Sequence, residues 1–322
     1  MRGRALVYYF GGRLLMLVPV TLLVTIAVFL LASLVPGGVV AVVLAGHPTD
    51  TATVDALRLK YHLNDPIYIQ YLAWVGNVIH GDLGRSILTS QPVSYAITTR
   101  LPLTVELNAG GLLLALTVGI PLGILAATKQ GRARDRGVVG IAVLGSSAPH
   151  FILALVILYV FAELLGWFPL FGVGADDTVD RLWHMVLPIV SLAIGPLAFV
   201  TKITRASMLD LIERDHIAFA RARGISEFRI MLVYLLRNAL IPVVTAAGLL
   251  LIGLLTGTVF VETIFGLPGL GGLLVSSVRG NDIPMIQGLV LVLAIWVVLA
   301  NLFIDALYVA IDPRVAFEPS TN

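Results

Sequence analysis

Six long apolar runs, each of at least twenty residues and almost free of charge, constrain the fold of this chain more than any other feature. A helix needs about 20 apolar residues to cross the hydrocarbon core of a bilayer. Lipid offers no partner for backbone polar groups, so a spanning segment must be a helix or part of a closed barrel. Because the runs are far longer than barrel strands, we expect transmembrane helices at residues 14–35, 103–128, 138–167, 185–204, 239–260 and 285–311.

The composition narrows the class of protein further. The chain is 58% hydrophobic and 12% charged, whereas about a quarter of the residues in soluble domains are charged. The predicted fold is therefore an all-α integral membrane protein with six transmembrane helices. The sequence contains no cysteine, which excludes disulfides and thiolate metal ligands. No segment fits the phosphate-binding pattern GxxxxGK[ST], so we expect a non-catalytic chain that does not hydrolyse ATP itself.

Charged segments divide the apolar runs into regions. Residues 1–35 hold a short basic start and the first run, which is too long for the apolar part of a cleaved signal peptide. A mixed insert follows, in which two amphipathic helices are predicted at residues 53–61 and 67–79. This insert covers residues 36–102. Spans two to four follow at 103–205, and a polar loop at 206–238. Residues 239–312 hold spans five and six, joined by a glycine-rich loop at 262–284, and residues 313–322 form a tail.

The distribution of positive charge predicts the orientation. Loops that face the cytoplasm carry an excess of lysine and arginine. Six spans place both termini on one side, together with residues 129–136 and 206–238, and these segments hold most of the basic residues. The opposite loops hold fewer basic residues than acidic ones. We therefore expect cytoplasmic termini, with the 36–102 insert on the outer side.

The most polar long run lies at residues 215–242, DHIAFARARGISEFRIMLVYLLRNALIP, here called the elbow. It predicts a short helix, a break at Gly224 and a second helix leading into Pro242. An ordinary basic loop bound to anionic lipid would explain its arginines. It would not explain why Ala220, Ala222 and Gly224 place small side chains beside Phe219. Small residues allow a partner's backbone to approach closely, and an aromatic side chain is a common interface anchor. The pattern therefore predicts a docking site for a cytoplasmic protein.

At the elbow, the sequences ARARGISEFRI (220–230) and RNALIPVVT (237–245) resemble the inner-membrane permease subunits of ABC importers, in the dipeptide, oligopeptide and nickel family, close to the B-type dipeptide permeases. The resemblance continues along the chain in the same order. It covers YIQYLAWVGNVIHGDLGRS (68–86) with Gln91, Pro92 and Val93, RLPLTVELN (100–108), GIPLGILAA (119–127), FGLPGLGGLL (265–274), NDIPMIQGLVL (281–291) and NLFIDALYVAIDPR (301–314). One departure lies just before Gly224, where Ala218 and Phe219 replace the acidic residue and first alanine that give the family's EAA loop its name.

The resemblance implies a mechanism and a set of partners. In this family the elbow is the EAA loop, whose coupling helix sits in a cleft of a cytoplasmic ATPase. The partners implied are two ATPase subunits that bind ATP and Mg²⁺, a second permease, an extracytoplasmic binding protein and the lipid of a bacterial inner membrane, with no nucleic acid. No cofactor is expected in this chain. The residues expected to couple it to the ATPase are Asp215, Ile217, Phe219, Ala220, Arg221, Ala222, Gly224 and Pro242.

Three ionisable residues in or near spans are candidates for the translocation path. His150 lies within the third run beside Pro149, and an intramembrane ionisable group usually faces a bundle interior or a water-filled path. A structural hydrogen bond at the proline kink is the alternative for His150. Glu106 and Glu262 lie near outward ends of spans, where they are candidates for an outward vestibule or for solvated helix ends.

A self-sufficient channel or secondary transporter is the second hypothesis. Secondary transporters are marked by internal repeats and helices broken near the bilayer midplane. No internal repeat is evident, although Pro121, Pro149, Pro188 and Pro196 are possible break points. An intramembrane protease is disfavoured because no GxSxG pattern and no matched aspartate pair is present.

Overall fold

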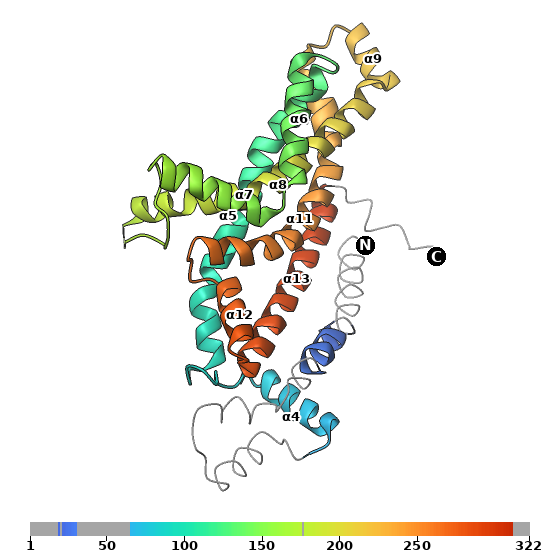
Figure 1. The fold of residues 1–322 in the computed structure, drawn as a ribbon. Coiled ribbons are helices and arrows are strands. Elements are labelled where there is room, and N and C mark those ends of the chain that lie inside the picture. The colour runs from blue at the N-terminus through green and yellow to red at the C-terminus, as the bar shows by residue number, and fades with distance from the viewer. Residues whose placement is uncertain (1–18, 20, 31–64, 176, 312–322) are drawn as a thin grey trace. The chain divides into compact units, whose positions relative to one another are not determined.

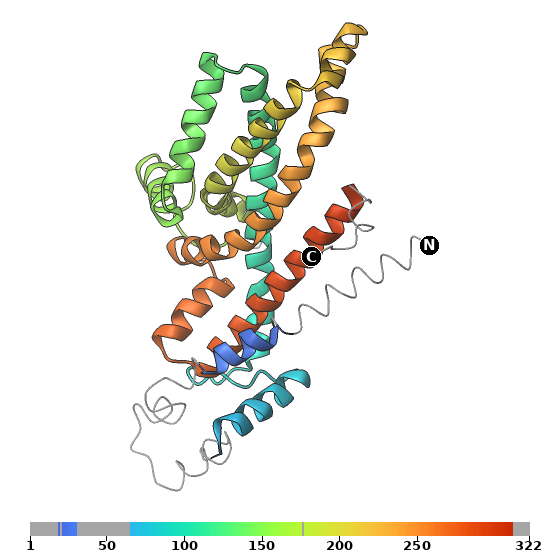
Figure 2. The ribbon, with the colours of Figure 1, turned by 90° about the vertical axis from the view of Figure 1, so that its right-hand side faces the viewer.

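The computed structural model describes residues 19, 21–30, 65–175 and 177–311. These residues fold into helices, and among them an isolated bridge between Arg85 and Pro92 is the only β-type pairing. The chain divides into two compact units, Met1–Pro102 with Gly269–Leu299 and Leu103–Pro268 with Ala300–Asn322. Figures 1 and 2 show the helices of each unit in two views. The predicted all-helical class is confirmed.

The larger unit is built around α8 (Thr178–Ile212), which packs against α6 (Ala133–Ser147), α7 (His150–Ile157) and α11 (Arg237–Ile264). Its apolar core includes buried residues of α8, of α11 and of α5 (Val93–Thr128), among them Leu107, Leu192, Leu254 and Val261. Pro121 lies within α5, and Pro188 and Pro196 lie within α8, without interrupting either helix.

Glycines bring α5 and α8 into close contact. A Cβ atom on Gly123 would lie 2.5 Å from Cβ of Thr204 and 2.8 Å from the carbonyl oxygen of Thr201. One turn earlier, a Cβ on Gly119 would lie 2.9 Å from Val200. Small residues drive close packing of membrane helices, because lipid tails supply no hydrophobic force between them. The cytoplasmic half of α8, as predicted from charge, is thus fixed against α5.

The third predicted span is bent rather than straight. Helices α6 and α7 meet at an angle of 106°, and the π-helical segment η1 (Leu158–Leu164) continues α7. The bend occurs at Ala148 and Pro149, which are extended with ψ angles of 136° and 140°. Proline lacks a backbone N–H and disfavours helical geometry in the residue before it. Of the four prolines considered as break points, Pro149 is the one that breaks a helix.

Four helices are long and apolar enough to cross a membrane, and the bent pair α6–α7 raises this to five among the described residues. The first predicted span, 14–35, falls largely outside the described residues, apart from a short apolar helix at Thr21–Leu30. The predicted helix at 53–61 also lies outside them. The fifth span is longer than expected, since its helical region extends from Glu227 to Ile264.

The smaller unit contains α4 (Ile67–Ile79), whose bounds match the prediction, and α12 (Leu270–Arg279). Residues 262–284 were expected to form a glycine-rich loop, and the helix α12 corrects that expectation. Leu270 and Leu273 of α12 are buried with Val93, Met285 and Leu289, which supplies the apolar face that stabilises this helix. In the same unit, buried Asp282 accepts a hydrogen bond from Ser86 Oγ at 2.5 Å and one from the Ile87 amide at 3.0 Å.

Candidate functional site: the elbow between α8 and α11

The elbow begins after α8 ends at Ile212 and lies at the end of the larger unit where α5 turns into α6 (Figures 1 and 2). It contains α9 (Asp215–Ala222), a turn, the short α10 (Glu227–Arg229) and the π-helical segment η2 (Ile230–Leu236). The predicted short helix and the break at Gly224 are confirmed. The second helix, which starts at Glu227, reaches Pro242 as predicted, but it continues past this residue to Ile264, so Pro242 lies exposed inside α11.

A glycine-based cap ends α9. Gly224 has a φ of 74°, and its amide donates to the Arg221 carbonyl at 2.9 Å. The Ile225 amide donates to the Ala220 carbonyl at 3.2 Å. These two bonds form a Schellman motif, which satisfies carbonyl groups left free at a helix C-terminus and needs a residue with positive φ. The turn after α9 is therefore defined by backbone geometry at Gly224.

One face of α9 is fastened to the helices beside it. Ile217 is fully buried and Ala220 nearly so, in a cluster drawn from four other elements. Ile225, which follows the cap, also packs on this cluster. The other buried members are Ala127 of α5, Met208 of α8, Ile230 and Leu235 of η2, and Ala239 of α11. A displacement of α9 would therefore act directly on the ends of α5, α8 and α11.

The opposite face of the elbow exposes two aromatic side chains. Phe219 of α9 is 65% exposed and Phe228 of α10 is 67% exposed. The Arg223 guanidinium lies over the Phe219 ring, 5.6 Å from its centroid. Aromatic residues, phenylalanine included, and arginine are enriched in protein interfaces relative to the rest of the surface. This face has the chemistry of a docking surface, whereas the Ile217 face belongs to the internal core.

Ion pairs lie at the two ends of α9. Arg221 donates to both carboxylate oxygens of Glu227, at 2.8 and 3.3 Å, and so joins α9 to α10. These hydrogen bonds raise the pKa of the Arg221 guanidinium above its ordinary value. Arg214, which precedes α9, pairs with Asp210 of α8 at 2.9 Å. Both pairs are solvent-exposed, so water screens their attraction and each contributes little to stability. They orient the elbow, while the buried cluster supplies most of its attachment.

The structure separates the residues expected to couple to a partner into two groups. Asp215, Phe219, Arg221, Ala222 and Gly224 are exposed on the elbow. Ile217 and Ala220 point into the internal cluster, so the small side chain at Ala220 allows α9 to approach its own neighbours rather than a partner. Pro242 lies exposed within α11 and outside the cluster that holds α9.

His150 faces the interior of the larger unit. It begins α7 directly after the bend, and a Cβ on Gly195 of α8 would lie 2.7 Å from its Cε1 atom. Gly257 of α11 lies on another side of the ring. The Nδ1 atom is buried and has no hydrogen-bond partner among the described residues. The hydrogen bond considered at the proline kink is thus not made by this nitrogen, and the position between three helices favours an interior role.

The two glutamates differ in their surroundings. Glu106 of α5 is partly exposed and accepts a hydrogen bond from Arg181 of α8 at 2.5 Å. Glu262 of α11 is completely buried and accepts one from Thr104 Oγ1 at 2.6 Å. A fully buried carboxylate does not line an open vestibule in this conformation, which corrects the expectation for Glu262. Its predicted outward solvation fails because the side chain is buried and bonded to Thr104 of α5.

Comparison with known proteins identifies the family. Residues 119–317, more than half of the chain, match the family described as the inner membrane component of binding-protein-dependent transport systems. The chain belongs to this family. The resemblance inferred from the motifs is therefore confirmed, and the matched residues include the whole elbow.

Two members of this transport family are similar over almost their entire length. The oligopeptide transport system permease protein AppB of Bacillus subtilis is 38% identical over 96% of this chain and 99% of its own. The glutathione transport system permease protein GsiC of Escherichia coli is also 38% identical, with the same coverage. A solved structure of the MetNI methionine ABC transporter in an inward-facing conformation aligns with a TM-score of 0.56 and 22% identity. It covers 67% of this chain and 96% of the solved chain, and supports the ABC importer permease fold.

Some residues of this permease's elbow were missed by sequence reasoning. Phe228 was not singled out, although its aromatic side chain follows the break by four residues and mirrors Phe219 in exposure. Glu227 was likewise not paired with Arg221. Helical spacing could not place them, because α10 is only three residues long and lies across the turn at Gly224 from α9.

Proposed function

We propose that this chain is the permease subunit of an ATP-driven importer of di- and oligopeptides. It forms half of a translocation path with a second, similar permease. Two ATPase subunits bind ATP and Mg²⁺ on the cytoplasmic side, and a separate binding protein delivers the peptide from outside. The elbow receives the movement of one ATPase subunit and passes it to α5, α8 and α11.

The two-faced geometry of α9 is the observation that supports this proposal most strongly. Its exposed face offers Phe219 and Arg223 to a partner, and its buried face carries Ile217 into the cluster at the helix ends. An exposed aromatic anchor suits binding, while a buried contact with three long helices suits transmission of movement. A loop that only held positive charge at the membrane surface would need neither face.

The peptide substrate is supported by the relatives. AppB is named for oligopeptide transport and GsiC for transport of glutathione, a tripeptide, at equal identity to this chain. Both names describe short peptides, so the shared chemistry is a small amide-linked substrate. Specificity among such substrates then rests mainly with the separate binding protein.

Reconstitution of the complete transporter tests the proposal. The assembled complex, with its ATPase subunits, second permease and binding protein, is placed in liposomes and supplied with labelled di-, tri- and pentapeptides or with Ni²⁺. We expect ATP-dependent uptake of at least one peptide class, and no uptake when the ATPase subunits are left out. Peptide uptake by this chain alone without ATP would support the channel or secondary-transporter hypothesis instead. ATP-dependent uptake of Ni²⁺ but of no peptide would overturn the substrate class.

A further inference from the structure

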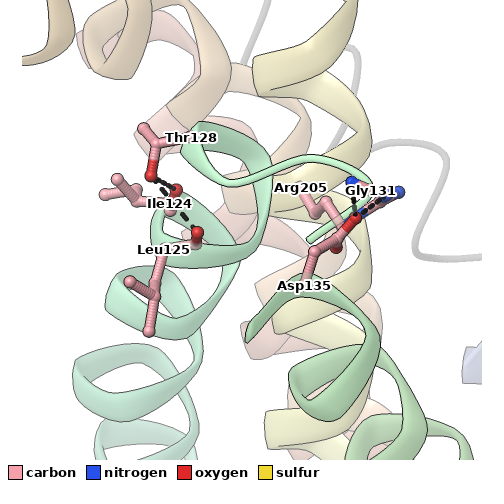
Figure 3. A network of polar contacts seen from close by, with 6 residues as sticks. All are labelled: Ile124, Leu125, Thr128, Gly131, Asp135 and Arg205. Carbon is pink, nitrogen blue, oxygen red and sulfur yellow. Dashed lines mark hydrogen bonds and ion pairs between the residues drawn. The ribbon is translucent and has the colours of Figure 1, made fainter. Parts of the chain in front are cut away.

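A partly buried ion pair joins α6 to α8 a short distance before the elbow. Asp135, in the first turn of α6, is 4% exposed. Arg205 of α8 donates from Nε to one of its oxygens at 2.6 Å and from Nη2 to the other at 2.8 Å. The Gly131 amide donates a third bond at 2.9 Å, which ties in the turn between α5 and α6. Figure 3 shows the carboxylate of Asp135 held between the Arg205 guanidinium and Gly131.

The ion pair is one of several contacts by which α6 packs against α8. On α8, Ile194, Ala198, Lys202 and Arg205 are spaced by four, four and three residues and share one face. Their contacts on α6 lie near the two ends of that helix. Gly145 fits against Ile194 and Ala198, Ser146 accepts a hydrogen bond from Lys202 at 2.6 Å, and Asp135 accepts the bonds from Arg205. Apolar contact thus gives way to polar contact toward the elbow.

The same part of α8 carries the elbow. Met208, one turn beyond Arg205, is fully buried in the cluster that holds Ile217 of α9. Ala127 of α5 joins this cluster only a few residues before Gly131. The ion pair therefore connects α6 to the two helix ends on which α9 rests. A bidentate arginine–carboxylate pair fixes orientation as well as distance, because both groups are planar.

We propose that the Asp135–Arg205 pair is a positioning element that makes α6 move together with α8 when the ATPase displaces the elbow. This inference rests on the proposed function. Without the pair, α8 can follow the elbow while α6 lags behind, and ATP hydrolysis then continues with less peptide transported. Substitutions between coupled sites change coupling from about twofold to about thirtyfold. We expect a fall of about tenfold in peptide transported per ATP hydrolysed for Asp135→Asn.

The test uses the complete complex in liposomes and compares four variants. Asp135→Asn keeps the shape but loses the charge, and Arg205→Lys keeps the charge but loses the two-pronged geometry. The exchange D135R with R205D restores an ion pair with its direction reversed. We expect transport per ATP to fall in the two single variants and to recover by at least threefold in the exchange, relative to D135N. Arg134→Gln, an exposed charge loss in the same turn of α6, is the matched control and should transport normally.

A distance measurement separates positioning from simple stability. The chain has no native cysteine, so Gly137→Cys on α6 and Ala206→Cys on α8 can carry a unique pair of spin labels at exposed positions. We expect one narrow distance distribution with and without a non-hydrolysable ATP analogue, and a distribution that broadens in D135N only with the analogue. An unchanged transport-to-ATP ratio in both D135N and R205K, or identical distributions in D135N and the parent, would overturn the inference. Loss of ATP-driven import by the unmodified complex would instead overturn the proposed function, because the label distances report on α6 and α8 alone.

Discussion

At the scale of single residues, Gly224 is required for its backbone and not for its size. A Cβ atom at this position would meet nothing within 4 Å, but the φ of 74° is unfavourable for residues with side chains. We expect Gly224→Ala to destabilise the end of α9 by about 1 kcal/mol, and Gly224→Asn by less, because asparagine adopts left-handed conformations more readily. The measurement is peptide transported per ATP hydrolysed in the reconstituted complex. A larger loss in Gly224→Asn than in Gly224→Ala would show that side-chain volume, not the backbone angle, is what matters.

Phe219 and Ile217 are two positions apart on α9, and we expect their substitution by alanine to impair different properties of the permease. Phe219→Ala removes an exposed anchor, so we expect the permease to keep its stability while its affinity for the ATPase falls by about thirtyfold, equivalent to about 2 kcal/mol. Ile217→Ala removes a buried contact and should lower the free energy of unfolding of the elbow by about 2–5 kcal/mol. Binding of purified ATPase and protease sensitivity of the elbow, measured on both variants, distinguish the two effects. Lost stability in Phe219→Ala together with lost ATPase affinity in Ile217→Ala would show that the two faces of α9 are assigned wrongly.

At the scale of helices, the contact between α5 and α8 depends on glycine. A Cβ on Gly123 would press on Thr204 and on a backbone carbonyl of α8, which cannot rotate away. We expect Gly123→Ala to destabilise the protein by about 1–3 kcal/mol by forcing the helices apart. Gly140 of α6 is the matched control, since a Cβ there meets nothing within 4 Å and alanine is the better helix former. Thermal unfolding in detergent checks both variants, and equal midpoints would show that the contact yields without cost.

The helices also show how far sequence reasoning reaches. Residues 67–79 and the break at Gly224 follow local rules of amphipathic spacing and backbone freedom, and both were predicted. The direction of the Ala220 side chain was not, because which face of α9 meets its own chain depends on distant residues such as Ala127 and Met208. The pair of Asp135 with Arg205 was missed for the same reason, since seventy residues separate its members and no local pattern links them.

At the scale of the whole molecule, the charge distribution predicts that the elbow faces the cytoplasm. The positive-inside rule rests on short loops rich in arginine and lysine, and the elbow and the turn at 129–136 are such loops. Ser226 in the elbow and Ala175 in the loop before α8 are both exposed and lie on opposite sides of the membrane in this prediction. Because the chain lacks cysteine, Ser226→Cys and Ala175→Cys each create a single labelling site.

Labelling of intact cells with a thiol reagent that does not cross the inner membrane tests the orientation. We expect Ala175→Cys to react in intact spheroplasts and Ser226→Cys to react only after the membrane is opened. The unmodified chain serves as the control, since it offers no thiol to either treatment. Reaction of Ser226→Cys in intact spheroplasts would place the elbow outside. The exposed Phe219 face would then be out of reach of a cytoplasmic ATPase, and α9 would need a different partner.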